Sequence, residues 1–205
     1  MSNSILSVKS LKKRFGGLEA VNVDSFELYE GEITSLIGPN GAGKTTFFDL
    51  ITRFQSADSG SIFLNKKNVT KLNSYKLARL GMVRTFQLTR VFDRMSVYEN
   101  MKFAGSSIKN EGFLKSLIQT KKLKQHEDQL DVKIDETLKL LNLIEMKNSY
   151  ARELSGGQKK LLELGRSLMK NPKILLLDEP LAGVNPKLSE ELLEIILNLN
   201  SQGIN

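Results

Sequence analysis

The chain has 205 residues, 40% of them apolar and 26% charged, which is enough for one globular domain with a sizeable core. It contains no cysteine, and this excludes a disulfide framework, a zinc–thiolate site and a thiol nucleophile. Its formal net charge of +7 indicates attraction to a polyanion, whether nucleotide, nucleic acid or an anionic membrane surface. No apolar run approaches the roughly 20 residues of a membrane-spanning helix, so we expect that the chain does not itself cross a membrane.

The first third of the chain has the pattern of antiparallel strands, and these are followed by a strand–loop–helix unit. The first 30 residues alternate apolar and polar positions and are interrupted by Gly16 and Gly17, which predicts antiparallel strands joined by a turn. An apolar run at 32–37 predicts a buried strand, and it leads through a glycine-rich loop into a helix predicted over 44–54. Further elements are expected in order: a turn at 58–60, a strand at 61–64 and a short helix at 74–81.

The periodicity becomes helical in the second half of the chain. Ser96 and Glu99 have the spacing of a capping box, and apolar residues at 134, 138 and 141 share one helical face. The remaining elements are predicted as a helix from 155 to about 171, a strand at 173–177 and a helix at about 186–199. Strands that alternate with helices favour an α/β fold with a mostly parallel sheet, an N-terminal antiparallel β subdomain and an inserted helical subdomain.

The glycine-rich loop fits the phosphate-binding P-loop pattern G-x-x-x-x-G-K-[ST] and has the strand-to-helix setting that this pattern requires. Its glycines allow backbone N–H groups to turn toward the β- and γ-phosphates of a nucleotide at the positive end of a helix. Lys44 adds a positive charge, and the Thr45 hydroxyl is a ligand for Mg²⁺. The residues expected to hold the phosphates are Gly38, Asn40, Gly41, Ala42, Gly43, Lys44, Thr45 and Thr46.

Two adjacent carboxylates, Asp178 and Glu179, follow an entirely apolar predicted strand. Buried carboxylates need a cation or hydrogen bonds, so the pair predicts a magnesium site beside the P-loop. In this interpretation Asp178 holds the ion, directly or through water, and Glu179 accepts a proton from the attacking water. The alternative is that both side chains are exposed and only cap the following turn.

Residues 154–158 read Leu-Ser-Gly-Gly-Gln and allow two interpretations. Ser155 and Gln158 have the spacing of an ordinary capping box. A cap does not need Gly156 and Gly157, however, and two glycines leave the first-turn N–H groups open to a phosphate. Motif physics alone leaves both interpretations standing.

The succession of a P-loop, Gln87, residues 154–158 and the Ile-Leu-Leu-Leu-Asp-Glu run at 174–179 resembles the ATP-binding cassette (ABC) ATPases in order and spacing. The resemblance covers nearly the whole chain and implies ATP and Mg²⁺ as cofactors and ATP hydrolysis as the activity. It implies that Phe15 stacks on adenine and that Gln87 touches Mg²⁺ and senses a permease. The implied metal ligands are Thr45, Gln87 and Asp178; the implied catalytic residues are Lys44, Gln87 and Glu179; the implied contacts to the ATP of a second subunit are Ser155, Gly156, Gly157 and Gln158.

The same resemblance implies the organisation and the partners of the protein. Residues 1–87 and 172–205 would form the P-loop NTPase core, and residues 88–171 a helical subdomain that contains the 154–158 motif. A second ATPase subunit, identical or different, would pair head to tail with the first. Permease subunits would place the dimer on the cytoplasmic face of the cell membrane as a peripheral protein, with a substrate-binding protein as an indirect partner and no nucleic acid expected.

Finer features look like the branch of the family that powers uptake of branched-chain amino acids and related amides. These features are the sequence at 81–87, the sequence at 181–186 and a long helical insert. Asn185 stands where many cassettes have Asp, and this branch commonly tolerates Asn at that position. A lipopolysaccharide-export ATPase, a non-transport ATPase that acts on nucleic acid or ribosomes, and a catalytically inactive scaffold remain the alternatives.

The resemblance also implies a further strand and a histidine that contacts the γ-phosphate, and neither is found in the 205 residues. The one histidine, His126, is expected on the surface of the helical region. We therefore expect a longer natural product, poor hydrolysis by the 205-residue form, and exposed apolar surface where the central strand would lie.

Overall fold

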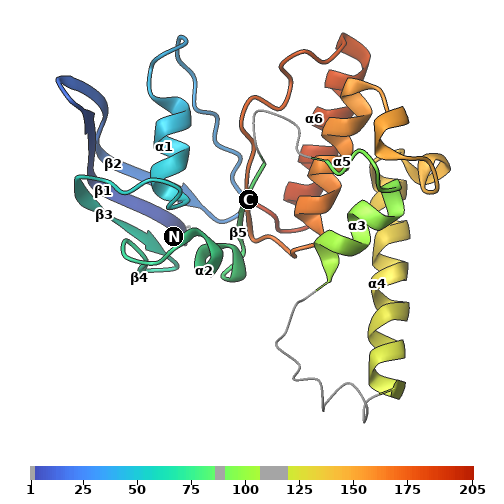
Figure 1. Cartoon of the computed structure of the whole chain (residues 1–205). Helices are drawn as coiled ribbons and strands as arrows, with labels where there is room; N and C mark the ends of the chain where they lie inside the picture. Colours follow the sequence, from blue (N-terminus) through green and yellow to red (C-terminus); the bar gives the residue numbers. More distant parts are fainter. Residues whose placement is uncertain (1–2, 86–90, 107–119) are drawn as a thin grey trace. The chain divides into compact units, whose positions relative to one another are not determined.

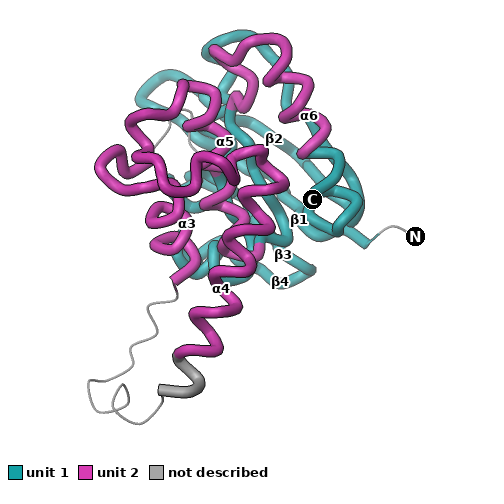
Figure 2. Tube along the Cα trace, turned by 90° about the vertical axis from the view of Figure 1, so that its right-hand side faces the viewer, with its two compact units in different colours: residues 1–84, 172–178, 196–205 teal, residues 85–171, 179–195 magenta. Residues whose placement is uncertain are grey.

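The computed structural model describes residues 3–85, 91–106 and 120–205, including the side chains of all but 120–123 in this range (Figure 1). The chain divides into two compact units (Figure 2). Unit 1 comprises residues 1–84, 172–178 and 196–205, and unit 2 comprises residues 85–171 and 179–195. Among the described residues, no helix is both long and apolar enough to cross a bilayer.

Unit 1 contains an antiparallel sheet whose strands have the order β2-β1-β3-β4. The strands are β1 (Ser4–Phe15), β2 (Leu18–Tyr29), β3 (Ser59–Leu64) and β4 (Lys67–Asn68). β1 and β2 form the predicted hairpin, with Phe15 opposite Leu18 and Gly16 at a positive φ of 57° in the turn. This confirms the antiparallel strands that the N-terminal alternation predicts.

β3 begins two residues earlier than its apolar pattern indicates, because Gly60 lies directly against β1. A Cβ on Gly60 would be 2.5 Å from the Ser10 carbonyl oxygen and 2.6 Å from the Leu11 Cα. The β1–β3 register shifts between Lys9 and Lys12, opposite this glycine. What the sequence presents as a turn is therefore an irregular start of a strand, which only glycine can form at this separation.

Two short helices complete the core of unit 1. In α1 (Lys44–Ile51) the Phe47 ring meets Phe26 of β2 edge to face at 5.4 Å. α2 (Ser74–Arg79) begins at Asn73, whose side chain accepts the Lys76 N–H, and is followed by Gly81 at a φ of 96°. The fully buried side chains include Leu6, Leu11, Leu50, Ile51, Ile62 and Leu77.

A parallel ladder joins distant parts of the chain. β5 (Met82–Arg84) pairs with β6 (Ile174–Leu176), and Arg84 lies opposite Leu176. Beside β6, Asn205 donates its N–H to the Lys173 carbonyl at 3.0 Å and accepts the Leu175 N–H at 2.7 Å, which is the parallel hydrogen-bond pattern. The described parallel sheet thus has two strands, and Asn205 alone pairs with the other edge of β6.

The strand predicted over 32–37 does not form, and that prediction is wrong for this structure. The segment has no strand assignment, and Ile33, Leu36 and Ile37 are 49%, 42% and 90% exposed. An apolar run becomes a strand only where a neighbouring strand pairs its backbone and a layer covers its side chains. Among the described residues no strand pairs with this segment.

Unit 2 is helical. Its elements are α3 (Val97–Gly105), α4 (Thr120–Leu140), the short 3₁₀ helices η1 (Ile144–Met146) and η2 (Ala151–Glu153), α5 (Gly156–Leu168) and most of α6 (Pro186–Ser201). The capping box predicted at Ser96 forms, and its hydrogen bond from the Ser96 N–H lowers the pKa of the Glu99 carboxyl. Helices pack closely at Gly165, where a Cβ would be 2.7 Å from Leu141 and 3.0 Å from Met101.

Lys133 of α4 closes the end of α5. Its ammonium donates to the carbonyls of Leu168 at 3.1 Å and Met169 at 3.2 Å and to the Asn171 side chain at 2.6 Å. Carbonyls in the last turn of a helix have no partner within the helix, and a cation there also matches the helix dipole. His126, on the same helix, is exposed as expected.

Replacing Leu138 with alanine should destabilise unit 2, because Leu138 is fully buried on the α4 face that the periodicity predicts. The expected loss is about 2–5 kcal/mol, the usual cost of a cavity left by leucine. Val132→Ala, on the same helix but 58% exposed, is the matched control and should change little. Urea unfolding followed by circular dichroism measures both, and equal shifts would contradict the assigned helix face.

Candidate nucleotide-binding site

The P-loop leads into α1 through glycines that no other residue could replace without strain. Gly41 and Gly43 have φ values of 84° and 83°, and Gly43 is the N-cap of α1. A Cβ on Gly43 would lie 2.1 Å from the Ala20 carbonyl oxygen of β2. Gly43 therefore allows the helix to begin directly against the sheet, with Gly38 to Ala42 exposed in front of it.

The Lys44 side chain folds back over the loop that precedes it. Its ammonium donates to the carbonyls of Gly38 at 2.7 Å and Pro39 at 2.9 Å. Thr45 is exposed and Thr46 is half-buried in the same first turn. This places a cation, a hydroxyl and the positive end of a helix at one point of unit 1, which is the chemistry that a polyphosphate needs.

Phe15 lies at the end of β1, and the residue is 48% exposed. Asp58 fixes this end of the strand, because it accepts from the Lys13 ammonium at 2.8 Å and from the Arg14 N–H at 2.7 Å. The hydrogen bond from Lys13 and that from Arg14 lower the pKa of the Asp58 carboxyl. Phe15 thus has a fixed backbone and a half-exposed side chain, and the Lys13 ammonium lies over its ring at 5.4 Å from the centroid.

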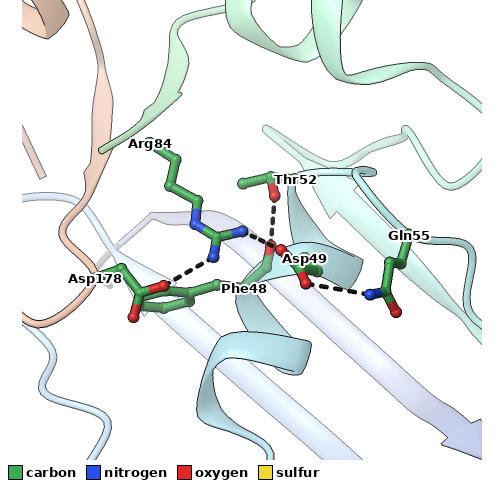
Figure 3. A network of polar contacts seen from close by, with 6 residues as sticks. All are labelled: Phe48, Asp49, Thr52, Gln55, Arg84 and Asp178. Carbon is green, nitrogen blue, oxygen red and sulfur yellow. Dashed lines mark hydrogen bonds and ion pairs between the residues drawn. The ribbon is translucent and has the colours of Figure 1, made fainter. Parts of the chain in front are cut away.

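Asp178 follows β6 and is buried, with its side chain 5% exposed. One oxygen, Oδ2, accepts from Arg84 at 2.8 Å, and Arg84 also binds Asp49 of α1 at 2.5 Å (Figure 3). The predicted metal ligand is therefore not an exposed cap, in contrast to the alternative interpretation of this carboxylate. Phe15, the P-loop and Asp178 all belong to unit 1.

Glu179 is the first residue of the second segment of unit 2. Its side chain is exposed, and its backbone has a φ of 48°, a left-handed conformation that is rare for residues with a long side chain. Its carbonyl accepts the Ala182 N–H at 3.1 Å and so forms a tight turn. Backbone strain of this kind concentrates at functional sites.

The 154–158 segment forms the capping box and also leaves the helix end open. Ser155 accepts the Gln158 N–H at 3.2 Å, and Gln158 accepts the Ser155 N–H at 2.9 Å. Gly156 is exposed, with no atom within 4 Å of the place where a Cβ would be. Gly157 has a different reason to be glycine, since its Cβ would meet the Leu188 Cδ2 at 2.1 Å. The capping interpretation is thus confirmed, and it does not close the helix end to a ligand.

The segment between Glu179 and α6 is held from both sides within unit 2. Lys160 of α5 donates to the Pro180 carbonyl at 3.5 Å and to the Ala182 carbonyl. Asn185 accepts the Leu188 N–H at 2.9 Å and so acts as the N-cap of α6. Asn and Asp serve equally well as N-caps, so asparagine at this position keeps the structural role.

Gln87 lies outside the described residues. Sequence reasoning missed three residues around the candidate site. Arg84 contacts Asp178, Asp49 holds Arg84, and Lys160 contacts the segment after Glu179. Their partners are distant in sequence, and a buried arginine in a three-residue strand gives no periodic signal. The one available signal was Arg84 itself, a charged residue directly after the apolar pair Met82-Val83.

The ABC transporter family profile matches residues 21–182. The chain belongs to this family. It is 41% identical over 201 residues to the high-affinity branched-chain amino acid transport ATP-binding protein LivG of Escherichia coli K12, covering 98% of this chain and 79% of LivG. It is also 41% identical over 202 residues, with the same coverage, to the corresponding protein BraF of Pseudomonas aeruginosa.

The fold agrees with the family. The ADP conformation of an ATP-binding cassette of an ABC transporter superposes with a TM-score of 0.83 at 38% identity, over 98% of this chain and 78% of that one. The chain is thus an ATP-binding-cassette ATPase with the P-loop NTPase fold, as its motif order predicts.

Gly156→Ala and Gly157→Ala should separate the open helix end from the packing beneath it. Gly156→Ala adds a methyl group in free space, so the melting temperature should stay unchanged while ATP turnover falls by about 10- to 100-fold through a displaced phosphate. Gly157→Ala should instead lower the melting temperature, because it pushes on Leu188. Thermal melts and phosphate-release assays give both values, and a Gly156→Ala protein with full turnover would contradict phosphate approach at this helix.

Proposed function

We propose that this protein binds ATP with Mg²⁺ and hydrolyses it to power the uptake of branched-chain amino acids or related amides. The observation that supports the transported substrate is the 41% identity, over 98% of the chain, to ATP-binding proteins named for branched-chain amino acid transport. The same observation weighs against lipopolysaccharide export and against a role on nucleic acid.

The phosphates would lie against the P-loop. In this proposal the backbone N–H groups of Gly38 and of residues 40–46 donate to the phosphates, the Lys44 ammonium neutralises part of their charge, and the Phe15 ring stacks on the adenine. Support comes from the open, glycine-capped start of α1 and from the position of Lys44 over the loop.

The residues present fit a magnesium ion bound together with nucleotide. Such an ion usually takes one or two protein oxygens and completes its shell with phosphates and water. Asp178 and the Thr45 hydroxyl would hold it, with Gln87 as a third ligand. Among the described residues no group of three or more acidic, histidine or cysteine side chains could hold a metal alone, which agrees with a site that needs the phosphates. When bound, the ion would neutralise charge on the phosphates.

Glu179 would act as the general base. Its exposed carboxylate can accept a proton from the water that attacks the γ-phosphate. Lys44 would stabilise charge on the transferred phosphate.

The transporter would also contain a second ATPase subunit and permease subunits. The open start of α5 at Ser155 to Gln158 would contact the ATP held by the P-loop of the other subunit. We further propose that residues 1–87 with 172–205 act as the nucleotide-binding core and residues 88–171 as the helical subdomain. Binding to permease subunits would place the dimer at the cytoplasmic face of the membrane. ATP would favour the closed dimer and hydrolysis would release it.

Replacing Lys44 with alanine should weaken nucleotide binding by about 10- to 100-fold, the effect of losing a hydrogen bond to a charged group. Fluorescence titration with a labelled ATP analogue measures the dissociation constant. Lys67→Ala removes the same charge from an exposed strand of unit 1 and is the matched control. Equal affinities for the two variants would show that Lys44 does not meet the phosphates.

Glu179→Gln should leave ATP binding intact and slow hydrolysis by about 10²- to 10⁴-fold, because the amide cannot accept the proton. The variant should also accumulate as an ATP-bound dimer in size exclusion with light scattering. Glu190→Gln, exposed on α6, is the control for the same chemical change. If wild type binds ATP and neither wild type nor Glu179→Gln forms a dimer with ATP, the scaffold alternative replaces the motor.

A further inference from the structure

Arg84 forms a buried bridge between two carboxylates of unit 1. Its side chain is 4% exposed, with Nη1 at 2.5 Å from Asp49 Oδ1 and Nη2 at 2.8 Å from Asp178 Oδ2. Asp49 lies on α1, the helix that begins at the P-loop, and Arg84 ends β5. The three residues come from parts of the chain that are 35 and 94 positions apart and meet at one guanidinium (Figure 3).

The surroundings hold the guanidinium in one place. The rings of Phe48 and Phe54 lie 5.6 Å and 6.0 Å from its central carbon. Gln55 donates to the second oxygen of Asp49 at 3.3 Å, so the carboxylate that anchors Arg84 is itself anchored. Because the guanidinium of Arg84 is planar and is held in place by these rings and by Asp49, it fixes the orientation of the Asp178 carboxylate.

The two oxygens of Asp178 have different partners. Oδ2 accepts from Arg84, whereas Oδ1 accepts no hydrogen bond from the described residues. A buried ion pair alone would need only one carboxylate for one guanidinium. Here two carboxylates share one guanidinium, so the formal charge of these three side chains together is −1.

We propose that Arg84 is a positioning residue that fixes the Asp178 carboxylate with Oδ1 presented to Mg²⁺, and that Asp49 keeps the three-residue cluster attractive to the ion. The inference rests on the proposed function. Arg84 would act through Asp178 and would not touch the nucleotide. Partners that orient a metal ligand typically change metal affinity by about 10- to 100-fold when they are removed.

Arg84→Lys tests the proposal, because it keeps the charge and loses the fork that reaches both carboxylates. A fluorescent, hydrolysis-resistant ATP analogue is titrated with the 205-residue protein, first in EDTA and then at increasing Mg²⁺. The expected result is a Mg²⁺ concentration for half-maximal tightening that is raised about 10- to 100-fold, with the EDTA affinity within about twofold of wild type.

Two variants complete the design. Arg79→Lys makes the same change on an exposed residue of α2 and should leave both values unchanged. Asp49→Asn removes the carboxylate that anchors Arg84, so the guanidinium should hold Asp178 less firmly and the Mg²⁺ requirement should also rise, by several-fold. If Arg84→Lys does not fold by circular dichroism, Asp49→Asn decides the question.

The outcomes are distinguishable. Wild type that fails to bind the analogue even in saturating Mg²⁺ would overturn the proposed function. If wild type binds the analogue and the folded Arg84→Lys protein has an unchanged Mg²⁺ requirement, the positioning role is overturned. Where Arg84→Lys does not fold, an unchanged Mg²⁺ requirement in Asp49→Asn overturns it. A variant that loses affinity equally with and without Mg²⁺ would assign Arg84 to packing alone and also overturn it.

Discussion

The candidate nucleotide site depends on one close approach, that of Gly43 to the carbonyl of Ala20. Because a Cβ there would lie 2.1 Å from that oxygen, α1 can start against β2 only with glycine at its N-cap. The start of α1 then sets Phe47 on Phe26 and carries Asp49 to the guanidinium of Arg84. Glycine at this one position thus places α1, which begins at the candidate phosphate-binding loop, and brings Asp49 to the buried Arg84.

The start of α5 differs from the tightly packed start of α1, because it is capped and also remains accessible. Ser155 and Gln158 satisfy each other's N–H groups, and Leu154 anchors the end in the core at 5% exposure. Gly157 makes room for Leu188, while Gly156 has open space in front of it. Capping and ligand access are therefore assigned to different residues of one short motif, and this is why the sequence alone allowed both interpretations.

The sequence predicted those features of the fold that depend on residues close together in the chain. The hairpin at Gly16, the start of α1 at Lys44, the capping boxes at Ser96 and Ser155 and the buried face of α4 follow from spacing within a few residues. The strand expected over 32–37 fails because a strand depends on a partner that its own sequence does not contain. Arg84 escaped prediction for the same reason, since its partners lie 35 and 94 residues away. Gln87 lies outside the described residues, so its role stays a prediction.

The contact of Lys44 with its own loop has a consequence for how a ligand would be retained. A lysine ammonium has three N–H bonds, and the carbonyls of Gly38 and Pro39 take two of them. An incoming phosphate can accept the third without displacing either carbonyl. Lys44 would then link the bound phosphate to Gly38 and Pro39 at the start of the loop. A bound phosphate would therefore make the loop more rigid, and the more rigid loop would lower the rate at which the phosphate dissociates.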